Sequence, residues 1–230
     1  MNLVAIFGGH DANITFYNAE TNKYHVIELE RLVKKRYFRL HVDNTQQEQY
    51  DIIKQCQLIS EKNWGIKNNY EKILICSDGF LQFDLRTIFN TSEIITVSTH
   101  HHCHAASAFY QSPFKEALIL SYDGGGDDGY FNFYVGNQNG IQHIKKLENH
   151  DFGGGYLLCG SVIREVAEKS SNILAFSGKL MGLCGYGKPI EGMTDSFKDL
   201  FLKRNYSKII DSINIPVEKD EETITKIRRK

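Results

Sequence analysis

Leu3-Val-Ala-Ile-Phe-Gly-Gly-His-Asp-Ala-Asn-Ile-Thr-Phe-Tyr17 decides the fold, because a later stretch of the chain echoes it. The echo is Leu118-Ile-Leu-Ser-Tyr-Asp-Gly-Gly-Gly-Asp-Asp-Gly-Tyr-Phe-Asn-Phe-Tyr134. Each copy reads as an apolar strand, a glycine-rich turn and a second strand. Backbone N–H groups at such turns form a concave nest for an anion, so the repeat predicts a clamp for a phosphate-bearing ligand. Two ordinary β-hairpins with glycine turns are the alternative interpretation.

Composition limits the classes of function. The chain has 230 residues and is 41% hydrophobic, which is enough apolar material to build a packed core. A formal net charge of −1 gives no general reason to bind nucleic acid or an anionic membrane, so we expect neither partner. The apolar run at the N-terminus is too short for a secretory signal or a membrane span, which predicts a cytoplasmic protein. The scattered cysteines argue against a disulfide framework and against a zinc ribbon.

Apolar periodicity outlines the elements around the repeat. Residues 72–76 and 93–97 read as buried strands. Residues 44–62 read as an amphipathic helix behind an N-cap at Asp43 or Asn44.

The domain organisation follows from the two copies. Ser112-Pro-Phe114 is the natural boundary between them. After it, three glycines precede a predicted helix over residues 156–169, and a glycine-rich segment over residues 177–187 predicts a close approach of the backbone to a ligand or another helix. The sequence therefore predicts an α/β fold with a first lobe over residues 1–114 and a second, truncated lobe over residues 115–230.

Histidines crowd one short segment of the chain, since four of the nine fall within residues 100–104. If this segment is helical, His100 and His104 stand one turn apart on one face, and their imidazole nitrogens can converge on one divalent cation. Imidazole ligands favour iron or zinc over magnesium. A polar helix start whose histidines face water is the alternative.

Five ordered blocks give the chain a resemblance to a known family. They are Gly8-Gly-His-Asp-Ala12, Glu30-Arg31 with Lys34-Lys-Arg36, His100-His-His-Cys-His-Ala-Ala-Ser-Ala-Phe109 with Ser112-Pro-Phe114, Ser121-Tyr-Asp-Gly-Gly-Gly-Asp127, and Gly178-Lys-Leu-Met-Gly-Leu-Cys-Gly-Tyr-Gly187. Together they resemble the N-terminal domain of the NodU/CmcH-type O-carbamoyltransferases. The resemblance spans the chain from its start to about residue 187.

The resemblance implies a fold and an activity. The fold is the actin-like ATPase fold, a duplicated, ribonuclease H-like βββαβα unit that is shared with the enzymes of tRNA threonylcarbamoylation. In the family, a separate C-terminal domain converts carbamoyl phosphate and ATP to carbamoyl adenylate. The actin-like domain then passes the carbamoyl group to a hydroxyl of a small-molecule acceptor. An iron-type metal on a His-x-x-x-His pair maps to His100 and His104, and zinc is the other metal we consider.

The same resemblance suggests roles for further residues. His10, with Asp11 beside it in the first glycine turn, is the candidate general base, because imidazole titrates near neutral pH. The predicted phosphate or acceptor contacts are Lys34, Asp123, the backbone amides of Gly124, Gly125 and Gly126, and Lys179. A turn histidine without a partner, a solvated turn aspartate and a surface lysine are the corresponding alternatives.

Some features depart from the family pattern. His102 and Cys103 stand where the family has leucine and alanine, so His101 and Cys103 remain alternative ligands. No segment after Gly187 resembles the acidic block that completes the metal site in the family. We expect the activating domain to lie elsewhere, in a second chain or in a further C-terminal region. The alternative function is a truncated, non-catalytic metal- or nucleotide-binding subunit of a split carbamoyltransferase.

Overall fold

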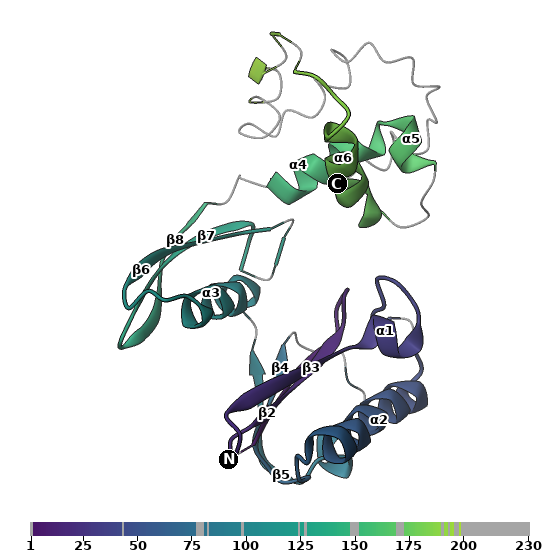
Figure 1. Ribbon diagram of the computed structural model, residues 1–230, viewed down its shortest axis with the longest axis vertical. Helices are drawn as coiled ribbons and strands as arrows, with labels where there is room; N and C mark the ends of the chain where they lie inside the picture. Colours follow the sequence, from purple (N-terminus) through teal and green to yellow (C-terminus); the bar gives the residue numbers. More distant parts are fainter. Residues whose placement is uncertain are drawn as a thin grey trace. The chain divides into compact units, whose positions relative to one another are not determined.

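The chain divides into two compact units, Met1–Cys103 and His104–Lys230, and the division falls within helix α3 (His100–Gln111) (Figure 1). The computed structural model describes residues 2–42, 44–76, 81, 83–97, 99–123, 125–126, 128–147, 152–168, 173–189, 191–192, 194–195 and 198. Strands and helices alternate as predicted, so the α/β fold is confirmed. A domain boundary between residues 114 and 115 stays a prediction.

The first unit is built on a five-stranded sheet with the strand order β3-β2-β1-β4-β5. Its strands are β1 (Leu3–Phe7), β2 (Asn13–Asn18), β3 (Lys23–Glu28), β4 (Tyr70–Cys76) and β5 (Thr91–Val97). The first three form an antiparallel meander, while β4 and β5 continue the sheet parallel to β1. A three-stranded meander continued by parallel strands after a helix is the arrangement that the βββαβα unit predicts.

Alternation along the central strands builds the core of this unit. Val4 and Ile6 in β1 and Ile14 in β2 are buried, and they lie in one cluster with Ile53 and Cys56 of helix α2 (Gln46–Trp64). Because side chains alternate across a strand, these residues all point to the face that α2 covers (Figure 1). The strands expected at residues 72–76 and 93–97 are confirmed as the greater part of β4 and β5, but their predicted burial is wrong, because within these two ranges only Ile73 is buried.

Helix α2 is confirmed, but its predicted N-cap at Asp43 or Asn44 is wrong. The N-cap is Thr45, whose hydroxyl accepts a hydrogen bond from the Glu48 backbone N–H at 3.3 Å. The Glu48 carboxylate in return accepts from the Thr45 backbone N–H at 2.7 Å. This reciprocal capping box satisfies donors at the helix start that a cap one or two residues earlier would leave unpaired.

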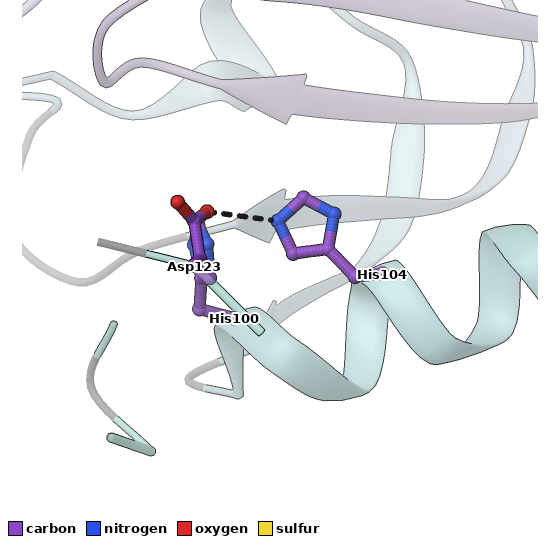
Figure 2. A group of neighbouring side chains, drawn as sticks. All are labelled: His100, His104 and Asp123. Atoms are coloured by element: carbon purple, nitrogen blue, oxygen red, sulfur yellow. Dashed lines mark ion pairs between the residues drawn. The ribbon is translucent and has the colours of Figure 1, made fainter. Parts of the chain in front are cut away.

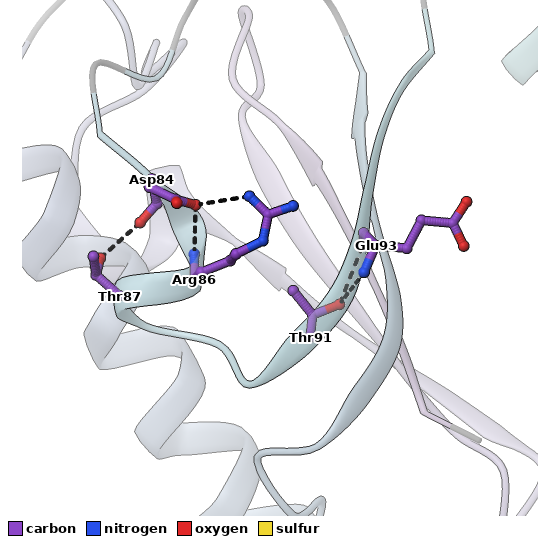
Figure 3. A network of polar contacts seen from close by, with 5 residues as sticks. All are labelled: Asp84, Arg86, Thr87, Thr91 and Glu93. Atoms are coloured by element: carbon purple, nitrogen blue, oxygen red, sulfur yellow. Dashed lines mark hydrogen bonds and ion pairs between the residues drawn. The ribbon is translucent and has the colours of Figure 1, made fainter.

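Side chains near the 3₁₀ turn Leu85–Thr87 fix the chain just before β5 (Figure 3). The Asp84 carboxylate accepts from the Arg86 backbone N–H at 2.9 Å, and the Thr87 hydroxyl donates to the Asp84 carbonyl oxygen at 2.7 Å. The Thr91 hydroxyl then donates to the Glu93 carbonyl oxygen at 3.1 Å.

The second unit opens with a three-stranded antiparallel sheet, β6-β7-β8. Its strands are β6 (Ala117–Tyr122), β7 (Phe131–Asn137) and β8 (Gly140–Leu147). The β6–β7 pair repeats the strand, turn and strand of β1–β2, which confirms the repeat seen in the sequence. Ala105 and Phe109 of α3 pack against Ile119 of β6 and Tyr134 of β7.

Three helices follow the sheet: α4 (Phe152–Ser161), α5 (Arg164–Ala167) and α6 (Ala175–Cys184). A single helix over residues 156–169 was expected, and that expectation is wrong. The helix starts earlier, at Phe152, and stops at Ser161, whose hydroxyl donates to the Leu158 carbonyl oxygen at 2.7 Å. Ile163 then takes an extended conformation and begins α5.

Of the two close approaches considered for residues 177–187, the one to another helix is made at Gly160 in α4 instead, and the one to a ligand stays a prediction. A Cβ added at Gly160 would lie 2.8 Å from the Cβ of Phe176 in α6, whereas one added at Gly178 or Gly182 would meet nothing within 4 Å. Gly160 therefore serves helix packing. Of the described helices, none has the length and apolar character needed to cross a membrane.

Candidate metal centre

Helix α3 has a stripe of buried side chains along one face, and two histidines lie beside this stripe. His101, Ala105 and Phe109 recur every four residues, and all three are buried. His100 and His104 each precede a residue of that stripe, so they stand one above the other along its edge. The helical geometry predicted from the sequence spacing of these two histidines is therefore present.

A carboxylate from the turn after β6 joins the two histidines. The Asp123 backbone N–H donates to the Tyr130 carbonyl oxygen at 2.9 Å, which closes the start of the turn. Asp123 Oδ2 lies 3.5 Å from His104 Nε2. One donor atom from each of His100, His104 and Asp123 lies within 4.8 Å of the other two (Figure 2).

This donor set fits a divalent transition metal. Two imidazole nitrogens and one carboxylate oxygen are typical of zinc and non-haem iron sites that keep coordination positions open. Metal–ligand bonds of about 2.0–2.2 Å place neighbouring donors roughly 3 to 3.5 Å apart, so small rotations of these side chains would bring them around one cation. His104 and Asp123 are both partly exposed, which leaves room for a further ligand.

The alternative ligands lie elsewhere on the helix. His101 is fully buried within the stripe, and the centroid of its ring lies 5.4 Å from that of the His100 ring in an edge-on arrangement. Cys103 is hydrogen-bonded to the thiol of Cys76 at the end of β4. Neither belongs to the three converging donors of the described residues.

His10 and Asp11 form a pair in the turn between β1 and β2. His10 Nδ1 lies 2.9 Å from Asp11 Oδ2, and both side chains are about half exposed. The turn is braced by the Gly8 carbonyl oxygen, which accepts from the Leu40 N–H at 3.0 Å and lies 2.8 Å from His41 Nδ1. An accessible imidazole oriented by a carboxylate is the arrangement required of a general base.

The buried side-chain amide of Asn132 forms a hydrogen bond to the second glycine turn, which follows β6. Asn132 is 1% exposed; its Nδ2 donates to the Asp128 carbonyl oxygen at 3.1 Å, and its Oδ1 lies 2.9 Å from His143 Nε2. Gly125 has φ 141°, which a residue with a side chain adopts only under strain. Gly126 accepts a hydrogen bond from a later residue of the turn, and Gly124 lies outside the described residues.

The two predicted phosphate-binding lysines are not in the histidine cluster. Lys34 ends α1 (Leu29–Val33) in a left-handed conformation with φ 57°, and its side chain is exposed. The Lys179 ammonium donates to the Val166 carbonyl oxygen at 3.5 Å, which ties α6 to α5. Their contacts with phosphate stay predictions.

Reasoning from the sequence missed the position of Asp123 beside His104, although it singled out Asp123 for a contact with phosphate or acceptor. A signal for it was present. Only the short connection over residues 112–116 separates α3 from β6, so a strand that packs on the helix must run back along it. The end of β6 then meets the first half of the helix, where the histidines lie.

Comparison with known proteins identifies the family of the chain. The family described as "Carbamoyltransferase N-terminus" matches residues 10–228. The nodulation protein NolNO of Sinorhizobium fredii is 28% identical over 158 residues, which are 68% of this chain and 22% of NolNO. An uncharacterised protein of Methanocaldococcus jannaschii is 32% identical over 117 residues, which are 46% of this chain and 19% of that protein.

A solved structure of full-length HypF in a phosphate- and nucleotide-bound form aligns with a TM-score of 0.46 and 14% identity, covering 78% of this chain and 30% of HypF. The chain spans about a fifth of the length of the curated relatives that it matches, between 16% and 22%. Since the family match extends over nearly the whole sequence, the chain belongs to the carbamoyltransferase N-terminus family.

Proposed function

We propose that this chain is the N-terminal part of a metal-dependent O-carbamoyltransferase. In the whole protein, a further region would make carbamoyl adenylate from carbamoyl phosphate and ATP, and the present part would pass the carbamoyl group to a hydroxyl of a small molecule. The observation that supports this most strongly is the convergence of His100, His104 and Asp123 in a chain that matches the family over residues 10–228.

His100 and His104 would hold the metal through imidazole nitrogens, and Asp123 through its carboxylate. We expect iron, with zinc as the other candidate, because imidazole nitrogens suit both better than magnesium. When bound, a divalent cation supplies a Lewis acid that polarises a carbonyl or phosphoryl oxygen. Three protein donors leave coordination positions to a substrate, as in metal sites that do chemistry.

His10 would take the proton from the acceptor hydroxyl. In a neutral imidazole whose Nδ1–H donates to Asp11 Oδ2, Nε2 is left as the proton acceptor. Asp11 would then stabilise the imidazolium that forms, because its carboxylate is already in place. The bracing of the turn through Gly8 would keep this pair oriented while the hydroxyl approaches.

The glycine turns would stabilise the anionic parts of the substrates. The backbone N–H groups of Gly125 and Gly126 lie in a glycine-rich turn. Turns of this kind bind anions through backbone N–H groups and need no charged side chain. Lys34 and Lys179 would add positive charge toward phosphate groups. Lys179 must first leave the Val166 carbonyl oxygen, an exchange that a phosphate oxygen makes favourable because the new hydrogen bond is charge-assisted on both sides.

The test uses this chain together with the further region, called the completing region below, that we propose makes carbamoyl adenylate. Carbamoyl phosphate, ATP and a panel of small hydroxyl acceptors are supplied, and carbamoylated products are measured by mass spectrometry. Wild type and His102→Ala should form product, whereas His104→Ala should not. His102 is the matched control because it lies on the same helix outside the donor cluster.

Two results would contradict the proposal in different ways. Product from His104→Ala at the wild-type rate would remove the metal centre from the reaction. Metal binding by wild type without any transfer, in the presence of the completing region, would favour the second function, a non-catalytic metal- or nucleotide-binding subunit.

A further inference from the structure

The outer edge of β6 differs from the other sheet edges of the described residues. The strand orders β3-β2-β1-β4-β5 and β6-β7-β8 make β3, β5, β6 and β8 the edge strands. Three of these strands carry charged side chains, which discourage pairing with another chain: Lys23 and Glu28 in β3, Glu93 in β5, and Lys145 and Lys146 in β8. The sequence of β6, Ala-Leu-Ile-Leu-Ser-Tyr, contains no charged residue, proline or glycine. An edge without these protective residues is suited to pairing with a further strand.

The internal repeat indicates what lies along the corresponding edge in the first unit. The β6–β7 pair repeats the β1–β2 pair, so the outer edge of β6 corresponds to the edge of β1 that faces away from β2. That edge of β1 pairs in parallel with β4, in a register that runs from Leu3↔Lys72 to Phe7↔Cys76. Among the described residues, no strand takes the same position beside β6. The repeat therefore predicts a parallel strand at this edge.

Side chains along β6 are exposed where those along β1 are half-buried. Because Ile119 packs against α3, the residues that alternate with it in β6 point to the opposite face of the sheet. These residues, called the apolar row below, are Leu118, Leu120 and Tyr122, and their exposed fractions are 64%, 52% and 62%. Their counterparts in β1, which has β4 alongside, are half-buried: Leu3, Ala5 and Phe7. A strand beside β6 would cover the apolar row in the same way.

Other elements of the second unit leave most of the apolar row accessible. Apolar residues of β7 pair in register with its three members and continue the apolar surface across the sheet: Val135, Phe133 and Phe131. The Phe152 ring of α4 lies beside one end of the row, with 6.0 Å between its centroid and that of the Tyr122 ring. Leu118, at the other end, is the most exposed of the three.

We propose that the outer edge of β6 pairs in parallel with an apolar strand of the completing region, which is thereby joined to the sheet of the second unit. The partner is assigned to that region because this chain spans only 16% to 22% of the length of its curated relatives. In such strand addition, main-chain hydrogen bonds supply affinity and side chains supply specificity. The inference rests on the proposed function only for the completing region itself, and it makes no use of the transfer reaction.

The chemistry of the partner strand follows from its place in the sheet. Strands that pair in parallel and are covered on both faces read as nearly continuous apolar runs, so we expect a run of about five such residues in the completing region. Parallel strands end at the same edge of a sheet. The carboxyl end of the added strand would therefore lie beside Asp123, which directly follows β6.

A second copy of this chain is the other occupant to consider. A twofold axis would pair β6 with the β6 of the partner subunit, and the two strands would then run antiparallel. The repeat favours a parallel strand instead, because β4 runs parallel to β1 at the corresponding edge. The direction of pairing therefore distinguishes the two occupants.

The first arm of the test follows amide hydrogen exchange in the protein that includes the completing region. Two strands of this chain serve as references: β1, which has a partner on both edges, and β8, which ends its sheet. We expect the amides of β6 to exchange as slowly as those of a strand paired on both edges, at least about tenfold more slowly than those of β8. A β6 that exchanges as fast as β8 would overturn the proposal. Because the measurement needs no turnover, a protein that protects β6 without transferring a carbamoyl group would contradict the proposed function alone.

The second arm uses Leu120→Lys in the same protein, with Ile144→Lys in β8 as the matched control. Both side chains are exposed in this chain, so lysine should be tolerated at either position unless a partner covers it. Leu120→Lys should speed the exchange of β6 by at least about tenfold, because a charge in a covered apolar layer is costly, whereas Ile144→Lys should not. Equal exchange of β6 in wild type and Leu120→Lys would overturn the proposal. The wild-type measurement needs no variant, so it decides the proposal if Leu120→Lys fails to fold.

The third arm identifies the partner and its direction with a photoreactive phenylalanine placed at Leu118 or, in a separate protein, at Tyr122. Light and isotope-labelled proteins are mixed, and cross-linked peptides are mapped by mass spectrometry. Both positions should link to one segment of the completing region, with Leu118 nearer its amino end and Tyr122 nearer its carboxyl end. The reverse order would overturn the parallel pairing. Links between light and labelled copies of this chain would make a second copy the occupant, and links to other parts of the same chain would remove the completing region as the partner.

Discussion

Asp123 Oδ2 lies 3.5 Å from His104 Nε2, so a turn between two strands and the first half of a helix share one polar contact. The contact depends on the packing of α3 against β6 and β7, through Ala105 and Phe109 on the helix. Substitutions that move the turn or the helix should therefore affect the same site.

Replacing Asn132 with leucine should destabilise the second unit and loosen the turn that holds Asp123. The change removes both hydrogen bonds of the buried Asn132 side chain, to His143 and to the Asp128 carbonyl oxygen, and each is worth about 0.5–1.5 kcal/mol net. Urea unfolding measures the stability, and Co²⁺ titration measures the site. Gln142→Leu, on the exposed surface of β8, should stay within about 0.5 kcal/mol of wild type. Equal stability of Asn132→Leu and wild type would show that the buried amide does not hold the turn.

Replacing Gly160 with alanine should destabilise the α4–α6 pair, whereas the same change at Gly178 should not. The new methyl group at Gly160 would lie 2.8 Å from the Phe176 Cβ and 3.1 Å from its carbonyl oxygen, and overpacking of this kind costs about 1–3 kcal/mol. Gly178 lies in α6 with open space around it, so alanine there should add up to about 1 kcal/mol of helix stability. Denaturant midpoints of the two variants should move in opposite directions, and midpoints that move together would contradict the helix pair.

The capping box of α2 predicts a pH dependence of stability. The Thr45 backbone N–H, and next its hydroxyl, donate to the Glu48 carboxylate and lower its pKa below 4.5. Because the folded pKa lies below the unfolded value, the carboxylate contributes stability above about pH 4.5, and this contribution is lost as pH falls through the folded pKa. Glu48→Gln should therefore be less stable than wild type at pH 7, and the gap should narrow in acid.

Thr45→Ala tests the other half of the same cap. Removing the hydroxyl that accepts from the Glu48 N–H should cost about 1 kcal/mol at pH 7. Thermal unfolding followed by circular dichroism measures both variants. A gap between Glu48→Gln and wild type that stays constant from pH 7 to pH 3 would rule out the carboxylate as the source.

Much of this fold was accessible from the sequence because period-two alternation and the repeated glycine turns are local signals. The β1–β2 and β6–β7 pairs and helix α2 follow from them. Other features depend on contacts between elements. The end of α4 at Ser161 and the approach of Gly160 to Phe176 arise where helices pack, and no periodicity reports them.

The candidate site divides in the same way. The spacing of His100 and His104 on one helix is a local signal, and it was sufficient to predict the pair. The third donor, Asp123, comes from a different element, the turn after β6. Such contacts require the helix to be docked on its neighbours, so the identity of the partner could not be obtained from spacing alone.

His10→Asn should abolish carbamoyl transfer in the protein that includes the completing region, without changing its metal content. Loss of a general base typically costs 10²- to 10⁴-fold in rate, so a drop of less than about tenfold would leave His10 as a structural residue of the turn. Rates are measured at saturating acceptor. His25→Asn is the matched control, because the His25 ring stacks on Trp64 rather than pairing with a carboxylate.

The central claim is that His100, His104 and Asp123 form one metal centre, and calorimetric titration of Co²⁺ into wild type and Asp123→Asn tests it most directly. Asp123→Asn keeps the size of the side chain and removes its charge. We predict that its affinity falls by more than the roughly 10- to 100-fold typical of residues that only position ligands, while His102→Ala binds like wild type. An Asp123→Asn protein that binds Co²⁺ as tightly as wild type would contradict the account, because the carboxylate would then not be a ligand.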